Sequence, residues 1–161
     1  MVMPFNADEV FEMAEQIERN GAKFYRAAAK KLPDVGKLLL NLAEMEDEHE
    51  KTFTAMRAEL AGEEVEEPVY DPDGDAQKYL RVMADGHVFD LKADPVEQLA
   101  DKETPEDILK MAMGAERDSI AFYVGLKDFV SQRAGKDKVE AIIKEEMGHI
   151  TTLNQKLEAL T

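Results

Sequence analysis

Two Glu-x-x-His pairs, Glu46 with His49 and Glu146 with His149, recur 100 residues apart in this sequence. Residues three positions apart lie on the same face of an α-helix, so the carboxylate and the imidazole of each pair can reach one ligand. Carboxylate and imidazole groups together suit divalent transition metals. The pairs therefore predict a metal site, provided that their helices turn them away from solvent.

Steps of three and four residues place both pairs on apolar helical stripes. The stripes through the two pairs are Leu39, Leu42, Glu46, His49, Phe53 and Met56, and Val139, Ile142, Glu146, His149 and Leu153. Two further stripes carry one glutamate each, and these are Phe11, Ala14, Glu18, Gly21 and Tyr25, and Leu109, Ala112, Glu116, Ser119 and Tyr123. The candidate ligand set is therefore four carboxylates and two imidazoles.

The stripes require four long helices, which we predict as two pairs over about residues 6–61 and 104–160. Asp34 and Thr104 are the predicted N-caps of the second and third helices, because such side chains accept hydrogen bonds from the first turn. We expect the third helix to end near Gln132. Each stripe glutamate then lies roughly 11 or 12 residues into its helix, or about 17 Å, so all four meet at mid-height in a bundle.

Residues 62–103 connect the two helix pairs, and we expect short helices within residues 76–102. The connection is long enough to return along a helix of roughly 40 Å. The pairs resemble a duplication, since DEVFEMAEQIERNGAKFY at 8–25 aligns with EDILKMAMGAERDSIAFY at 106–123. We predict one all-α domain over residues 1–161, a four-helix bundle with a long crossover between the second and third helices.

The charge of the stripe residues also points to metal. Four carboxylates buried without counter-charge would cost on the order of several kcal/mol each. Two divalent cations would balance four carboxylate charges, and the ligand set suits iron or manganese better than zinc in a closed tetrahedral site. In the alternative interpretation, the chain is a non-catalytic bundle whose glutamates and histidines pair with one another.

Composition narrows the classes of partner. The formal net charge of −15 argues against nucleic acid and anionic membrane surfaces, because both would repel the chain. The sequence has no cysteine, which excludes disulfides and thiolate metal sites and is compatible with a reducing compartment. We find no signal-peptide pattern and no apolar run long enough to span a membrane, so we expect a cytoplasmic protein.

At these residues the sequence resembles the ferritin-like di-iron carboxylate proteins, and most closely their rubrerythrin branch. The resemblance covers the four long helices and rests on ERNGAKFY at 18–25, EDEH at 46–49, ERDSIAFY at 116–123 and EMGH at 146–149. It implies a ferritin-like bundle, a homodimer and two iron ions per chain, with manganese as an alternative. By the same resemblance Glu18, Glu46 and His49 bind one iron and Glu116, Glu146 and His149 the other, with Glu46 and Glu146 as bridges.

The resemblance also implies a function, the reduction of hydrogen peroxide or dioxygen in oxidative-stress defence. Two departures bear on it. Rubrerythrins usually carry a second carboxylate on the third helix, and that carboxylate is involved in ligand rearrangement during the peroxidase cycle. This chain has Ser119 at the corresponding position. They also usually carry a rubredoxin-like domain with four cysteine ligands, which a chain without cysteine cannot have, so the electrons must come from a separate donor protein.

Tyr25 and Tyr123 are the candidate catalytic side chains near the predicted site. Each could hydrogen-bond a ligand or supply an electron, or could be a core aromatic whose hydroxyl finds a carboxylate partner. A second candidate function is iron storage, as a ferroxidase subunit of a ferritin-type assembly. Against it, we expect no fifth helix of the kind that such cages usually carry, because the sequence ends at Thr161 directly after the predicted fourth helix.

Overall fold

The computed structural model describes residues 7–62, 73–84, 94–100 and 104–160. Four long helices dominate these ranges, and they are α1 (Ala7–Lys31), α2 (Gly36–Gly62), α5 (Pro105–Lys127) and α6 (Lys136–Ala159). Two short helices, α3 (Asp75–Ala84) and α4 (Pro95–Ala100), and a 3-10 turn, η1 (Pro33–Val35), complete the described elements. The described residues contain no strand.

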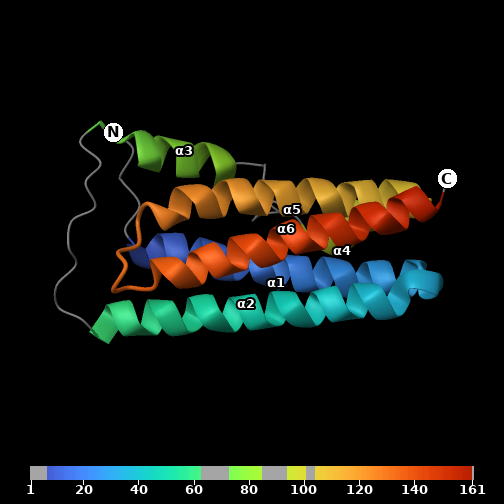
Figure 1. Ribbon diagram of the computed structural model, residues 1–161, viewed down its shortest axis with the longest axis horizontal. Coiled ribbons are helices and arrows are strands. Elements are labelled where there is room, and N and C mark those ends of the chain that lie inside the picture. The colour runs from blue at the N-terminus through green and yellow to red at the C-terminus, as the bar shows by residue number, and fades with distance from the viewer. Residues whose placement is uncertain (1–6, 63–72, 85–93, 101–103, 161) are drawn as a thin grey trace.

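The four long helices lie side by side as a bundle (Figure 1). Helix α1 packs most extensively on α2, and α5 packs most extensively on α6. Helix α2 ends at one end of the bundle and α5 begins at the other, so the chain crosses the length of the bundle between them (Figure 1). The predicted all-α bundle with a long crossover between the second and third long helices is therefore the observed architecture.

The short helices of the crossover cover the outside of the bundle. Helix α3 packs on α5 and α4 packs on α1. The Tyr79 hydroxyl donates a hydrogen bond of 2.6 Å to the Ala121 carbonyl of α5, and Leu80 is fully buried. Gly125 permits this close approach, because a Cβ there would lie 2.6 Å from a ring carbon of Tyr79.

Local signals set the starts of α5 and α6, and the cap of α5 is the predicted one. The Thr104 side chain accepts a hydrogen bond of 3.1 Å from the Asp107 backbone N–H, which caps α5. Gly135 precedes α6 with a φ of 109°, a left-handed conformation that glycine adopts without strain.

Two predicted boundaries are wrong. Asp34 lies within the 3-10 turn η1, so it is not the N-cap of α2, which begins at Gly36. Helix α5 ends at Lys127 and not near Gln132. The Phe129 and Val130 backbone N–H groups instead close tight turns onto the Leu126 and Lys127 carbonyls. Both side chains are buried, so packing against the core ends the helix early.

The core extends along the whole bundle and is rich in aromatic side chains. The largest fully buried side chains are Tyr25, Tyr123, Phe11, Phe24, Phe53 and Phe122. The Phe53 ring lies 5.2 Å from the Tyr123 ring and 6.3 Å from the Phe11 ring, measured between centroids. Burying each such side chain stabilises the fold by roughly 1.5–3 kcal/mol, so these apolar layers contribute strongly to the stability of the bundle.

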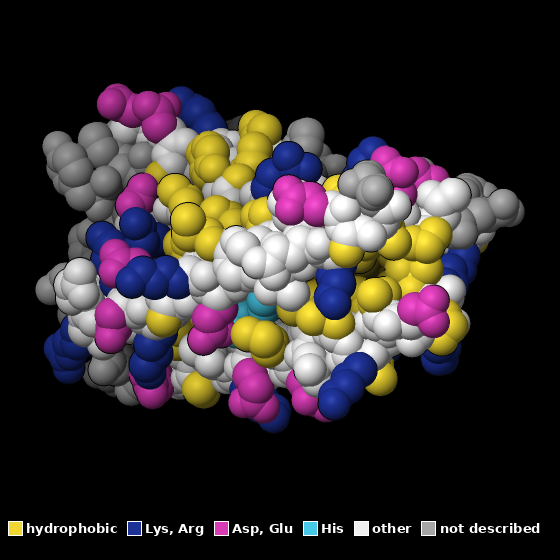
Figure 2. Space-filling view, turned by 45° about the vertical axis from the view of Figure 1, so that its right-hand side comes forward, with side chains coloured by type: hydrophobic (Ala, Val, Ile, Leu, Met, Phe, Trp, Pro, Cys, Tyr) yellow, Lys and Arg dark blue, Asp and Glu magenta, His cyan; other side chains and the backbone are white. Residues whose placement is uncertain are grey.

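On the face shown in Figure 2, charged side chains of both signs are scattered among hydrophobic and other uncharged groups. Within the residues described, none of the helices has the length and apolar character needed to cross a membrane. The largest set of ion pairs on the outside of the bundle joins Arg57 of α2 to Asp8, Glu12 and Glu15 of α1, at distances of 2.7 to 3.7 Å. Exposed pairs of this kind contribute only modestly to stability.

Candidate metal centre

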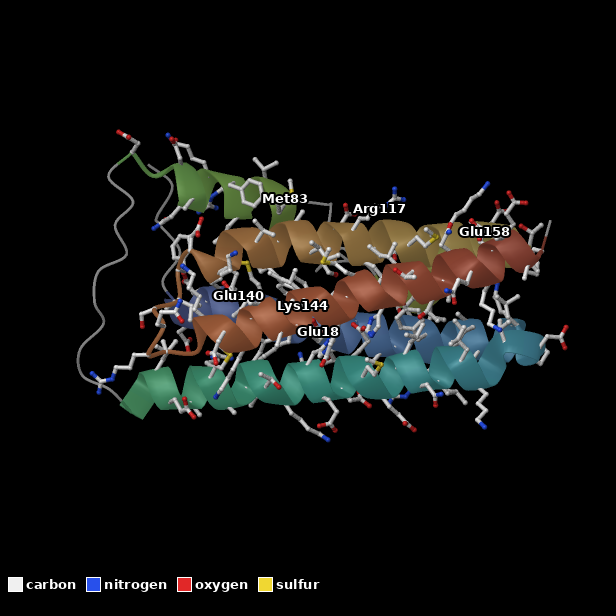
Figure 3. All side chains as sticks on the ribbon, in the orientation of Figure 1. Glu18, Met83, Arg117, Glu140, Lys144 and Glu158 are labelled. Atoms are coloured by element: carbon white, nitrogen blue, oxygen red, sulfur yellow. The ribbon has the colours of Figure 1, made fainter. Side chains whose placement is uncertain are left out.

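All six predicted ligands point into the middle of the bundle. Helix α1 supplies Glu18 and α5 supplies Glu116, whereas α2 and α6 each supply one Glu-x-x-His pair. The six side chains are 0% to 3% exposed. Each glutamate lies ten or eleven residues after the first residue of its helix, so helix length alone brings them to one level. Figure 3 shows Glu18 among the side chains enclosed by the long helices.

The ligand atoms form two overlapping groups. The first group comprises Glu18, Glu46, His49 and Glu146, and the second comprises Glu46, Glu116, Glu146 and His149. Within each group, one atom from every residue lies within 4.8 Å of the others. Glu46 and Glu146 belong to both groups, so the structure defines two adjacent candidate metal positions that share two carboxylates.

Both imidazoles direct Nδ1 toward the carboxylates. His49 Nδ1 lies 3.0 Å from Glu146 Oε1 and 3.4 Å from Glu18 Oε2. His149 Nδ1 lies 3.1 Å from Glu46 Oε1 and 3.1 Å from Glu146 Oε2. The two rings stack with centroids 5.8 Å apart. Each metal position is therefore offered one imidazole nitrogen of the same type.

Many of these buried atoms lack a hydrogen-bond partner among the described residues. They are Glu18 Oε2, Glu46 Oε1, Glu116 Oε2, both Glu146 oxygens, Nδ1 of both histidines and His149 Nε2. Several lie within ion-pair distance of one another, but their alignment does not make a hydrogen bond. Leaving buried polar atoms unsatisfied costs roughly 1–3 kcal/mol each, more when they are charged. Inward-facing carboxylate and imidazole atoms without partners are the donor set that a divalent cation requires, so the residues fit metal.

The carboxyl groups repel one another in this buried position. Burial and the neighbouring charges of Glu146 and Glu18 raise the pKa of Glu46 well above its ordinary value. Burial and Glu146 likewise raise the pKa of Glu116 to about 8. Glu146 behaves differently, because its contacts with Glu116 and both imidazoles outweigh burial and lower its pKa. Without metal, burial and mutual repulsion therefore favour the protonated forms of Glu46 and Glu116.

The imidazoles also retain protons when no metal is bound. Burial on its own would lower the pKa of His49, but Glu146 and Glu18 raise it to about 11. In the same way Glu116 and Glu146 outweigh burial and raise the pKa of His149 to about 9. Metal ligation requires unprotonated Nδ1 atoms and ionised carboxylates, so metal binding must displace these protons.

Each of the two candidate tyrosines donates a hydrogen bond to a carboxylate of the other helix pair, from α1 to α5 or from α5 to α1. The Tyr25 hydroxyl of α1 donates to Glu116 of α5, and the Tyr123 hydroxyl of α5 donates to Glu18 of α1. Both tyrosines are fully buried, and burial followed by the nearby carboxylates raises the pKa of each. The hydroxyls therefore stay protonated as donors, the arrangement expected of core aromatics with carboxylate partners.

Ser119 does not join the ligand set. It is buried, but its hydroxyl donates a hydrogen bond of 3.0 Å to the Ala115 carbonyl one turn back in α5. The helix that usually supplies two carboxylates in rubrerythrins thus supplies one here.

One side chain beside the site was missed by sequence reasoning. Glu145 Oε2 of α6 lies 2.5 Å from His49 Nε2 of α2. Glu145 precedes Glu146 and lies outside the apolar stripe, so the spacing along α6 does not mark it. Only the packing of α6 beside α2 brings it to the outer nitrogen of His49.

Comparison with known proteins places this geometry in a family. A comparison with curated protein sequences gives no significant match. The structure resembles that of a candidate ferritin-like diiron-carboxylate protein from Thermotoga maritima, with a TM-score of 0.72 and 23% sequence identity over 100% of both chains. This likeness identifies the fold as a ferritin-like bundle. The family model for rubrerythrin matches residues 9–157, a range that contains all six converging side chains, and the chain therefore belongs to the rubrerythrin family.

Proposed function

We propose that this chain is a di-iron oxidoreductase that reduces hydrogen peroxide, or dioxygen, with electrons from a separate donor protein. The observation that supports it most directly is the sharing of Glu46 and Glu146 between two adjacent ligand groups. Two adjacent redox-active ions could each contribute one electron to the same substrate.

Each metal position would be held by one unshared glutamate, one imidazole Nδ1 and the two shared glutamates. Glu18 and His49 belong to the first position, and Glu116 and His149 to the second. When bound, a pair of ferrous ions supplies two electrons, which with two protons convert one hydrogen peroxide to two waters.

The protein's own contribution is orientation and exclusion of water. Tyr25 and Tyr123 hold one oxygen of Glu116 and Glu18 by hydrogen bonds, which leaves the other oxygen of each carboxylate free to face a metal. The buried rings of Phe53 and Tyr123, the latter bonded to Glu18, lie with their centroids 5.2 Å apart. This apolar shell strengthens electrostatic interactions at the site and limits side reactions with solvent.

The electrons would come from outside the chain, because the sequence contains no cysteine for an iron–sulfur or rubredoxin-type centre. We propose a homodimer as the working assembly. Iron storage in a cage of many subunits is the competing function, and gel filtration separates the two because a cage elutes far ahead of a dimer.

The decisive experiment compares oxidants. The metal-free chain is loaded with ferrous ion under anaerobic conditions, then mixed separately with hydrogen peroxide and with dioxygen in a stopped-flow spectrophotometer. We expect oxidation by peroxide to be much faster than oxidation by dioxygen. Rapid consumption of dioxygen with formation of a ferric mineral would instead favour storage.

A pair of variants tests the metal site itself. Glu46→Gln removes a shared carboxylate charge, and Glu59→Gln makes the same change at an exposed position of α2. We expect iron near two ions per chain in the wild type and in Glu59→Gln, and well below this in Glu46→Gln. A wild-type protein that takes up no iron or manganese after reconstitution would contradict the proposal.

A further inference from the structure

The two Glu-x-x-His pairs are alike in sequence but not in surroundings. Aligning α2 with α6 through these pairs places Met45 opposite Glu145, directly before the shared glutamates. His49 Nε2 contacts Glu145 Oε2 at 2.5 Å. His149 Nε2 is buried and has no hydrogen-bond partner in the described ranges of the chain. The internal symmetry of the bundle is therefore broken at the outer nitrogens of the imidazoles.

The contact with Glu145 determines the tautomer and the ring orientation of His49. Because His49 Nδ1 faces Glu146 and Glu18, its Nε2 faces away from the cluster and can donate to a carboxylate. A carboxylate accepting from the outer nitrogen fixes the tautomer and the ring orientation, and makes the inner nitrogen a stronger ligand. His49 has such a partner and His149 has none that the structure describes.

Glu145 lies at the boundary between the interior and the surface, because its carboxylate contacts the buried His49 while much of its side chain is exposed. Its side chain is 52% exposed, whereas that of His49 is 4% exposed. Glu145 also lines a surface cleft with Met45, Glu44 and Glu48 of α2. On the face shown in Figure 2, a small area of histidine side chain reaches the surface between acidic and hydrophobic groups.

We propose that Glu145 is a positioning residue for His49, and that it makes the metal position beside His49 bind divalent metal more tightly than the position beside His149. The proposal rests on the metal site proposed above. It requires no contact between Glu145 and the metal, since Glu145 acts through the imidazole. Loss of such an outer partner typically weakens metal binding about 10- to 100-fold.

The test is a titration of the metal-free full chain with Co²⁺ alone. Binding is monitored by calorimetry and by the visible absorption spectrum of the bound ion. We expect two unequal binding steps in the wild type. Glu145→Ala should weaken the tighter step about 10- to 100-fold and leave the other within a factor of about two. Glu145→Gln should recover part of the loss, because its amide oxygen still accepts from Nε2–H.

Glu140→Ala is the matched control. Glu140 lies on α6 nearer its N-terminal end (Figure 3), and its side chain is also 52% exposed. Its nearest cation is Lys127 of α5, 3.9 Å away, and not a histidine. Neither binding step should change in this variant.

A second readout follows the hydrogen bond itself. In the Co²⁺-loaded protein, the Nε2–H protons of ligating imidazoles give shifted proton NMR signals. We expect Glu145→Ala to broaden one such signal through exchange with water and to leave the other unchanged.

Wild-type protein that binds no Co²⁺ would overturn the proposed function together with this inference. If the wild type binds two ions with equal affinity, or if Glu145→Ala weakens neither step or both steps equally, the role of Glu145 is overturned and the metal site stands.

Discussion

We expect metal and protons to compete for the buried cluster, and the metal-free protein to lose stability as pH rises from 5 to 8. The pKa values of Glu46, Glu116, His49 and His149 all lie above their ordinary values in the folded chain. A group of this kind stabilises the fold fully below its unfolded pKa, and the contribution disappears as pH rises through the folded pKa. Glu146, whose pKa is lowered, contributes a constant amount above pH 5.

The magnitude follows from the size of the shifts. The pKa of Glu116 rises from 4.5 to about 8, so between pH 5 and pH 8 it alone contributes a loss on the order of 4 kcal/mol, at about 1.4 kcal/mol per unit. His149, raised from 6.5 to about 9, adds to the loss above pH 6.5. The free energy of unfolding of a domain this size is typically about 5–15 kcal/mol, so the change should be large.

The assay is urea denaturation followed by circular dichroism between pH 5 and pH 8, at constant ionic strength. The metal-free free energy of unfolding should fall across this range. With Mn²⁺ bound it should rise or stay level, because metal binds more tightly as its ligands lose protons. The general charge repulsion of a chain with net charge −15 could also make stability depend on pH, and the Glu116→Gln variant distinguishes this effect from that of the cluster. If the cluster is the cause, the variant should show a flatter dependence of the metal-free free energy of unfolding on pH. A metal-free stability that is constant or rises from pH 5 to pH 8 would refute the reasoning.

Two further predictions concern packing and hydrogen bonding, and both are measured as urea denaturation of the metal-free protein. Gly125→Ala should destabilise by about 1–3 kcal/mol because its Cβ meets Tyr79, whereas Gly114→Ala, with open space around it, should stabilise by about 0.5–1 kcal/mol. Equal effects of the two substitutions would contradict the close approach of α3. Tyr123→Phe should cost about 1–3 kcal/mol, because it leaves a buried oxygen of Glu18 without a donor. An unchanged midpoint would show that this bond is absent in solution.

Much of the site could be predicted from the sequence, because helix geometry converts spacing into position. The three-residue spacing of Glu46 and His49 places them on one face, and the apolar residues around them show that the face is buried. The similar depth of Glu18 and Glu116 in their helices then brings them to the same level. Each of these inferences depends on residues within one helix, where backbone geometry is regular.

The remaining features depend on contacts between helices distant in the sequence. Phe129 ends α5 early because it packs into the core, and no local signal marks that contact. The exchange of partners between Tyr25 and Glu116, and the approach of Glu145 to His49, join residues 91 and 96 positions apart. The sequence by itself determined the four helices and, through periodic spacing, the glutamate and histidine side chains that meet inside the bundle. Only the tertiary structure decided which carboxylate each tyrosine bonds and which imidazole has an outer partner, because these follow from the rotation and offset of packed helices.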